Sequence, residues 1–416
     1  MEPVKYPSRC VERFLEYVTH DTQSREDSES YPSTPGQLVF LERLRAELVK
    51  LGLADVILDA NGYLFATLPS TVDDDVPVIG FLAHVDTSPE MPGKDVRPIV
   101  HRNYQGEDIV LPDDPTVVLR ERDTPWLAEQ RGNDIITASG TTLLGADNKA
   151  GVAEIVAAAE YLLAHPEIPH GPIRIGFTPD EEIGQGTKYF DVKAFGASCA
   201  YTMDGETLGE IQSETFSADT CVLRFVGFNT HPGFAKGTMV NAIRAAARFI
   251  ADLPTDSASP ESTEEREAFV HPYVVDAAVD CTTVRVLVRS FDSAGLERLH
   301  TLLRKTAHRS LERSPGARVE IEVEESYRNM GEILKDHPQV VEHAREAIRR
   351  AGLELREKPI RGGTDGSRLS FMGLPTPNIF AGEHNFHSRT EWVSTHDMQK
   401  AVDVIIELCQ VWAEAD

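Results

Sequence analysis

The chain has 416 residues, 41% of them hydrophobic, and a formal net charge of −26, which predicts a folded protein of two or three domains. This negative charge would repel phosphate backbones and argues against nucleic-acid binding. No apolar run approaches the about 20 residues of a membrane-spanning helix, and Met1–Cys10 lacks the apolar stretch of a secretory signal. The five cysteines are scattered without a C-x-x-C pair, which argues against disulfides and predicts a reducing, cytoplasmic location.

The N-terminal part alternates predicted helices and strands. Helical periodicity covers residues 7–18, and Thr34-Pro35 supplies the N-cap and first-turn proline of a helix that runs to Gly52. Further strands are predicted at residues 55–58, 63–68 and 77–84, the last an apolar run typical of a buried strand. Residues 88–139 are rich in proline, aspartate and glycine and predict a long irregular excursion.

Regular elements then return. A strand-like run, TTLLGA, leads to Asp147, and a helix is predicted over residues 148–163. Strands follow at residues 172–177 and 198–203. Because strands alternate with helices, we expect an α/β domain with a mixed, mostly parallel sheet and helices on both faces.

The middle of the chain has the order β-α-β-β-α-β, the ferredoxin-like pattern. Its predicted elements cover residues 217–228, 238–253, 270–277, 283–289, 293–311 and 318–324. Alternation resumes with a helix, a short strand and a closing helix at residues 337–351, 376–380 and 397–412. We therefore expect a catalytic domain in two segments, 1–210 and 326–416, around an inserted α+β domain at 211–325.

Metal-ligating side chains follow five strand-like runs. They are His84 with Asp86, Asp147, Glu181 with Glu182, Asp204, and His387. Because ligands bind at the carboxyl ends of parallel strands, we expect these side chains to converge in one crevice. Clustered carboxylates repel one another, and divalent cations remove that repulsion.

The number of these side chains favours two ions. Asp147 is the candidate bridging ligand, with His84 and Asp204 completing one ion and Glu182 and His387 the other. A mixed imidazole and carboxylate set suits zinc, with cobalt or manganese as alternatives.

The two neighbouring carboxylates take different roles. Asp86 lies on the same side of an extended strand as His84, where it can orient the ligating ring. Glu181 is assigned as the general base because Glu182 is used as a ligand. Each of these motifs alone is more often a turn or a helix cap, and only their joint occurrence at strand ends favours a metal site.

At these residues the chain resembles metallopeptidase family M20, and within it the tripeptide aminopeptidases. The matching stretches, in chain order, are His84–Pro89, Leu144–Asp147, Thr178–Gly184, Met203–Gly205, His231–Gly233, Ala235–Gly237, Met239–Ala242, Arg361–Gly366, Leu369–Pro375 and Asn385–His387. The resemblance implies a metal-dependent peptidase domain with a smaller lid domain and two zinc ions. It implies His84, Asp147, Glu182, Asp204 and His387 as the zinc ligands, Asp86 beside them, and Glu181 as the proton acceptor.

The resemblance also implies roles for the inserted domain and for the substrate. His231 would donate to the developing oxyanion, and the less favoured alternative is that its His-Pro-Gly stretch forms only a tight turn. Asn241 would bind substrate or only cap the next helix, and Arg289 and Arg361 are candidates for the carboxylate of the peptide. The substrate would be a short peptide, a tripeptide with a free N-terminus. Related enzymes often pair through the lid, which leaves a homodimer open.

Three departures from the family pattern affect substrate preference more than chemistry. They are Asn148, Ser290 and the stretch Ser388-Arg389-Thr390. The alternatives are another M20-type activity, namely a dipeptidase, a carboxypeptidase or an N-acyl amino-acid deacylase, and more remotely a non-catalytic peptide-binding protein. The net charge argues against a two-metal nuclease or phosphatase.

Overall fold

The structure is a computed structural model that describes residues 3–73 and 75–415. The chain divides into two compact units. The first comprises Met1–Ser213, Ile333–Lys358 and Thr364–Asp416, and the second comprises Glu214–Glu332 and Pro359–Gly363. The boundaries thus lie a few residues beyond 210 and 325. Pro359–Gly363, which the sequence analysis assigned to the catalytic segment, belongs to the second unit.

An eight-stranded sheet forms the centre of the first unit, in the order β1-β2-β8-β3-β9-β16-β10-β15. Its strands are β1 (Ala54–Leu58), β2 (Leu64–Leu68), β3 (Ile79–His84), β8 (Ile173–Thr178), β9 (Cys199–Gly205), β10 (Glu210–Gln212), β15 (Arg356–Glu357) and β16 (Asn378–Phe380). Strands β8, β3, β9 and β16 are parallel neighbours, whereas β2 pairs antiparallel with both β1 and β8, and β10 pairs antiparallel with β16. The predicted fold class, a mixed and mostly parallel sheet, is confirmed.

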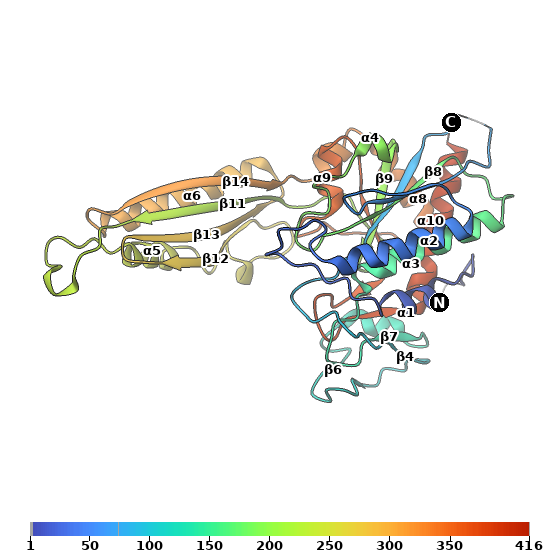
Figure 1. Cartoon of the computed structure of the whole chain (residues 1–416), viewed down its shortest axis with the longest axis horizontal. Coiled ribbons are helices and arrows are strands. Elements are labelled where there is room, and N and C mark those ends of the chain that lie inside the picture. The colour runs from blue at the N-terminus through green and yellow to red at the C-terminus, as the bar shows by residue number, and fades with distance from the viewer. Residues whose placement is uncertain (1–2, 74, 416) are drawn as a thin grey trace. The chain divides into compact units, whose positions relative to one another are not determined.

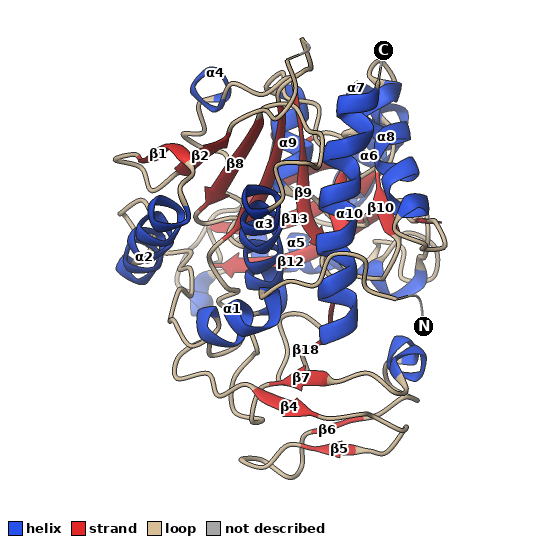
Figure 2. Cartoon of the chain, turned by 90° about the vertical axis from the view of Figure 1, so that its right-hand side faces the viewer, coloured by secondary structure: helices blue, strands red, loops and turns tan. Residues whose placement is uncertain are grey.

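Helices cover both faces of this sheet. They are α1 (Cys10–Tyr17), α2 (Pro35–Leu51), α3 (Ala146–Ala164), α4 (Val192–Phe195), α8 (Pro338–Arg350), α9 (Asp365–Phe371) and α10 (Thr395–Glu414), with α7 (Gly331–Leu334) at the unit boundary. Figure 2 shows α3 and α10 in front of the sheet. Along β3, Phe81 faces residues of α3 and α10, and the next residue, Leu82, packs with Phe195 and Leu369 on the opposite face. Because both faces are covered, every residue of β3 is buried.

The excursion at residues 88–139 is not irregular, which corrects the sequence analysis. It contains β4 (Ile99–His101), β5 (Ile109–Val110), β6 (Val118–Leu119), the 3-10 helix η1 (Pro125–Gln130) and β7 (Ile135–Thr137). Strands β4 and β7 join β17 (Glu383–His384) and β18 (Trp392–Ser394) in a small sheet, and β5 pairs with β6. These strands are two or three residues long, too short to give a period in the sequence, and β7 also pairs with β18, which lies far along the chain.

The second unit is a ferredoxin-like domain with strand order β12-β13-β11-β14, all antiparallel. Its elements are β11 (Ser217–Val226), η2 (Pro232–Phe234), α5 (Ala242–Ala251), η3 (Pro260–Ser262), β12 (Phe269–Ala277), β13 (Cys281–Ser290), α6 (Ser293–Glu312) and β14 (Arg318–Tyr327). In Figure 1 the four strands lie together with α5 and α6, which both contact β11 and β13. Helix α5 begins later than predicted, because Val240 still pairs with Phe228 and Asn241 is its N-cap.

No helix in the described part of the chain is long and apolar enough to cross a membrane.

The core of the second unit gives a stability prediction. Phe249 of α5 is fully buried against Phe225 and its neighbours, whereas Phe234 in the loop before α5 is 79% exposed. We expect Phe249→Ala to lower the free energy of unfolding by about 3–5 kcal/mol through the cavity it leaves. Phe234→Ala should change it little. Chemical denaturation followed by circular dichroism measures both, and equal effects would contradict the proposed core.

Candidate metal centre

The predicted ligands meet at the carboxyl edge of the central strands. His84 ends β3, and Asp204 is the penultimate residue of β9, the neighbouring strand in the sheet. Glu182 follows β8, and His387 follows β16 in the loop between β17 and β18. Because β8, β3, β9 and β16 are parallel neighbours, residues from distant parts of the sequence reach one place.

Asp147 follows a loop and not a strand, which corrects the prediction from the sequence. The run TTLLGA is not a strand: Thr141–Gly145 is a loop that enters α3. Gly145 has a φ of 82°, a left-handed conformation that favours glycine, and Asp147 has non-helical angles of φ −78° and ψ 102°. The first turn of α3 is therefore kinked so that the Asp147 carboxylate faces the strand ends.

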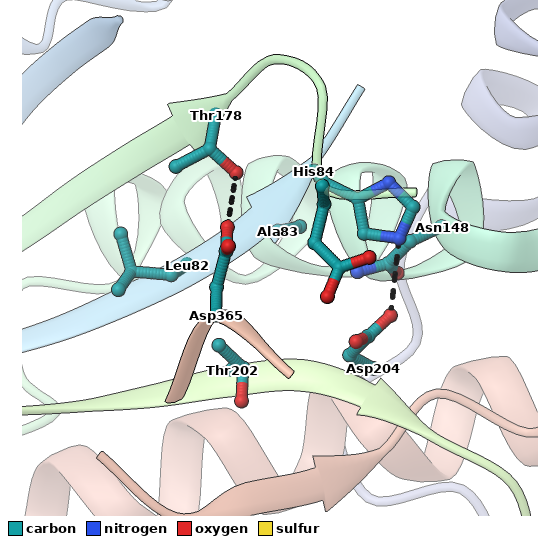
Figure 3. A pocket seen from close by; sticks show the side chains of 9 residues that line it. Leu82, Ala83, His84, Asn148, Thr178, Thr202, Asp204 and Asp365 are labelled. Carbon is teal, nitrogen blue, oxygen red and sulfur yellow. Dashed lines mark hydrogen bonds and ion pairs between the residues drawn. The ribbon is translucent and has the colours of Figure 1, made fainter. Parts of the chain in front are cut away.

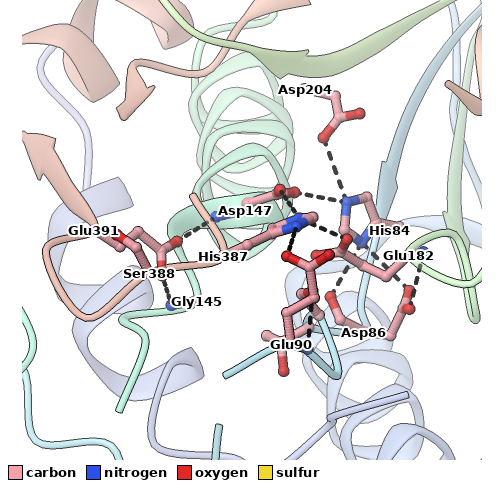
Figure 4. A network of polar contacts seen from close by, with 12 residues as sticks. His84, Asp86, Glu90, Gly145, Asp147, Glu182, Asp204, His387, Ser388 and Glu391 are labelled. Carbon is pink, nitrogen blue, oxygen red and sulfur yellow. Dashed lines mark hydrogen bonds and ion pairs between the residues drawn. The ribbon is translucent and has the colours of Figure 1, made fainter. Parts of the chain in front are cut away.

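The ligand atoms form two groups of three that share Asp147 (Figure 4). One group is His84, Asp147 and Asp204, and the other is Asp147, Glu182 and His387, with the ligand atoms of each group within 4.8 Å of one another. Asp147 Oδ1 lies 2.9 Å from His84 Nε2, and Asp147 Oδ2 lies 3.3 Å from His387 Nε2. Each oxygen of this carboxylate thus faces a different histidine, as a bridging ligand of two ions requires.

Each group is completed by a second carboxylate. Asp204 Oδ1 is 3.4 Å from His84 Nε2, and Glu182 Oε2 is 2.8 Å from His387 Nε2. The other oxygen of Glu182, Oε1, is buried and has no hydrogen-bond partner among residues 3–73 and 75–415. A buried, unpartnered carboxylate oxygen beside two imidazoles is what a cation site provides, so these residues fit two divalent ions.

Carboxylates outside the two groups orient both histidines. The Nδ1 atom of His84 is 3.1 Å from the main-chain oxygen of Asp86 and 3.3 Å from its carboxylate. The Nδ1 atom of His387 lies 3.2 Å from Glu90. Such contacts fix the ring and leave Nε2 for the metal. Asp86 also accepts the backbone N–H groups of Glu181 (3.0 Å) and Glu182 (3.2 Å), so it holds that loop in place.

In the metal-free site, the pKa values of both histidines and of Glu182 are raised, which favours their protonated forms. Burial opposes the charge on His84, but hydrogen bonds to Asp147, Asp204 and Asp86 raise its pKa well above the ordinary value. Burial likewise opposes the charge on His387, yet contacts with Asp147 and Glu182 raise its pKa to about 11. Burial and the nearby charge of Asp147 raise the pKa of Glu182 to about 8.

Glu181 belongs to neither ligand group. It lines a small pocket with His84, Asn148 and Asp204, and burial raises its pKa well above the ordinary value. A carboxylate that is not a metal ligand and whose pKa is raised can accept a proton near neutral pH, as a general base must.

Asp365 lines the same pocket (Figure 3). As the first residue of α9 it accepts a hydrogen bond from Thr178 Oγ1 at 2.9 Å, and burial raises its pKa to about 7. The sequence analysis did not assign Asp365, although it lies in the Arg361–Gly366 stretch that matched the family. The sequence analysis also missed Glu90 and Glu391, the second of which accepts backbone N–H groups of residues 144–147. Neither residue carries a local signal, because their partners lie far along the chain.

The four other candidates lie in the second unit, where their contacts are internal. His231 Nδ1 accepts the N–H of Gly233, and Asn241 caps α5 by accepting the N–H of Arg244. Arg289 lies over the Tyr327 ring. Arg361 donates to main-chain oxygens of residues 263, 265 and 267 and lies over the Phe216 ring. Their substrate roles remain predictions.

Comparison with known proteins places this arrangement in a family. The model of "Peptidase family M20/M25/M40" matches residues 116–411. The chain belongs to this family. It is 48% identical to "Peptidase T" of Geobacillus sp. (strain WCH70) over 407 residues, which are 98% of this chain and 99% of that protein.

Two solved structures share the M20 fold. One is aminopeptidase PepT from Bacillus cereus, with a TM-score of 0.75 and 24% identity over 98% of each chain. The other is the Bacillus subtilis YXEP protein, described as a dinuclear metal binding peptidase, with a TM-score of 0.66 and 17% identity over 98% of each chain. Full-length similarity to curated M20 peptidases, together with the fold, makes this chain a peptide hydrolase.

Metal binding should release protons. In the metal-free site the pKa of His84 is raised well above its ordinary value and that of His387 to about 11, which favours the imidazolium form of both rings at neutral pH, and each ring must lose one proton to bind a cation. The apparent zinc affinity should therefore rise as pH rises from 6 to 8. Calorimetry in buffers of different ionisation enthalpy measures the release, and His387→Ala should reduce it. Heats that do not depend on the buffer would contradict this protonation state.

Proposed function

We propose that the protein is a zinc-dependent aminopeptidase that removes the N-terminal residue from tripeptides. The observation that carries the proposal is the Asp147 carboxylate, whose two oxygens face two separate histidine–carboxylate pairs, with Glu181 unligated beside them. The name of the Geobacillus relative and the descriptions of the two solved structures support the same activity.

The residues present suggest how the reaction proceeds. His84, Asp147 and Asp204 would hold one ion, and Asp147, Glu182 and His387 the other. Two such ions supply an acidified water and polarise the peptide carbonyl. Glu181 takes a proton from the attacking water and returns it to the nitrogen that leaves, so one water is consumed for each bond broken. Asp86 keeps the His84 ring and the Glu181–Glu182 backbone aligned throughout.

The choice of zinc rests on the donor set. Two imidazole nitrogens and three carboxylates suit zinc, and cobalt or manganese would accept the same ligands. His231, Asn241, Arg289 and Arg361 remain the proposed contributions of the lid. We keep a homodimer and a cytoplasmic location as further parts of the proposal.

Substrate end-preference tests the activity. The zinc-loaded protein is incubated with Ala-Ala-Ala, Ala-Ala, acetyl-Ala-Ala-Ala and Ala-Ala-Ala-amide, and the products are followed by mass spectrometry. We expect rapid release of alanine from the free tripeptide and none from the acetylated one. Cleavage of the amide shows whether the terminal carboxylate is needed. Cleavage of only the dipeptide or only the acetylated peptide would replace the aminopeptidase with a sister activity.

The role of Glu181 is tested separately from metal binding. Glu181→Gln keeps the shape of the side chain but removes the base, so kcat should fall about 10²- to 10⁴-fold. Zinc content, measured by mass spectrometry of the dialysed protein, should remain at the wild-type value. Wild-type turnover would exclude Glu181 as the base, and loss of zinc would make it a ligand instead.

A further inference from the structure

Asp147 must be placed accurately because both candidate ion groups use it. Its side chain is short, so the position of its oxygens follows closely from the backbone of residues 144–147. That backbone is a loop entering a kinked helix, not a strand fixed by a sheet ladder. Some other contact has to hold it.

The Glu391 carboxylate makes this contact. Its Oε2 atom accepts the N–H groups of Leu144 at 2.6 Å and Gly145 at 2.9 Å, and its Oε1 atom accepts the N–H of Asp147 at 3.0 Å (Figure 4). Glu391 is only 1% exposed, so solvent hardly competes for these donors. Hydrogen bonds to a carboxylate are stronger than neutral ones, and both of its oxygens are used here.

Glu391 is itself firmly anchored, and it shares its loop with His387. On one side Trp392 begins β18 and pairs with Thr137 of β7. On the other side the N–H of Glu391 contacts the Ser388 oxygen at 3.3 Å, and Ser388 Oγ donates to the Asn385 oxygen at 2.6 Å. One carboxylate therefore joins the segment that carries Asp147 to the segment that carries His387.

We propose that Glu391 is a positioning residue that sets the Asp147 bridge between the two metal ions. This inference rests on the proposed two-metal function and extends it to a residue outside the ligand set. Glu391 is in neither group of candidate ligands among the described residues, and its carboxylate contacts the protein backbone only. It acts on the reaction through Asp147 and His387.

The variant Glu391→Gln tests the proposal. A glutamine side chain accepts through one oxygen only, and its NH₂ group would face at least one backbone N–H donor. Zinc affinity, measured by competition with a chromogenic chelator, should fall about 10- to 100-fold. At saturating metal, kcat should fall while KM for the tripeptide stays near the wild-type value, since the Glu391 carboxylate is buried and engaged with backbone N–H groups.

A spectroscopic readout separates positioning from general stability. In the manganese-loaded full-length protein, the electron paramagnetic resonance spectrum reports the exchange coupling between two bridged ions. Glu391→Gln should weaken this coupling. A merely structural role would lower the melting temperature but leave the coupling and the metal-saturated kcat unchanged, and that result would overturn the proposal.

Two further variants complete the design. Glu154→Gln is the matched control. Like Glu391, Glu154 has a buried carboxyl group, but it lies on α3 and neither of its oxygens has a hydrogen-bond partner within the described part of the chain. Its zinc affinity and coupling should match wild type, and an equal loss in both variants would overturn the proposal. If Glu391→Gln does not fold, Glu391→Asp keeps the charge but has a shorter reach, and should give a smaller loss of affinity and coupling.

The outcome also separates this proposal from the proposed function. Wild-type protein that binds two coupled ions yet cleaves no peptide would refute the aminopeptidase activity. The role of Glu391 would still be read from affinity and coupling. Wild-type protein that binds a single ion would overturn the bridge itself, and the role of Glu391 with it.

Discussion

Electrostatic repulsion among buried carboxylates is the constraint on which the rest of this structure depends. Four parallel strands and one helix bring Asp147, Glu181, Glu182 and Asp204 to one edge of the sheet, where little water screens them. Burial first, and the charges of neighbouring carboxylates second, raise the pKa values of Glu181, Glu182 and Asp204 in the metal-free protein. Two divalent cations bound between these groups and the two histidines remove the repulsion. Folding thus prepares a cavity whose charge favours the ions that the chemistry needs.

The sheet alone does not make the site accurate. Strand ends fix His84 and Asp204, but Glu182 and His387 lie on loops, and Asp147 lies in the kinked first turn of α3 just after a loop. Carboxylates outside the ligand groups hold those loops: Asp86 binds the backbone of Glu181 and Glu182, and Glu391 binds the backbone of residues 144–147. Each uses backbone N–H groups, which are rigid donors, so the ligands are positioned by main-chain contacts as much as by their own side chains.

The second unit has a separate hydrophobic core and elements that the sequence predicts directly. Its antiparallel sheet and two helices enclose a core of its own around Phe225 and Phe249, and its elements are long enough for their periods to be read from the sequence. The predicted ferredoxin-like order is therefore reproduced element by element. The substrate candidates Asn241 and Arg361 are engaged in contacts inside this unit, as a helix cap and as a guanidinium held by main-chain oxygens. Any role toward a peptide would have to be compatible with those contacts.

The sequence by itself determined the elements with a clear period and the side chains that follow them. Because the ends of parallel neighbours meet, the residues after the strands at 77–84, 172–177 and 198–203 predicted which groups would gather, and the structure brings these predicted ligands together. Only the tertiary structure decided the rest. TTLLGA had the composition of a strand but is a helix entrance, and the strands at 88–139 are too short to show a period, with β7 joined in one sheet to the distant β18. The positioning contacts of Glu90 and Glu391 are with residues more than 200 positions away, and no local sequence pattern predicts such a contact.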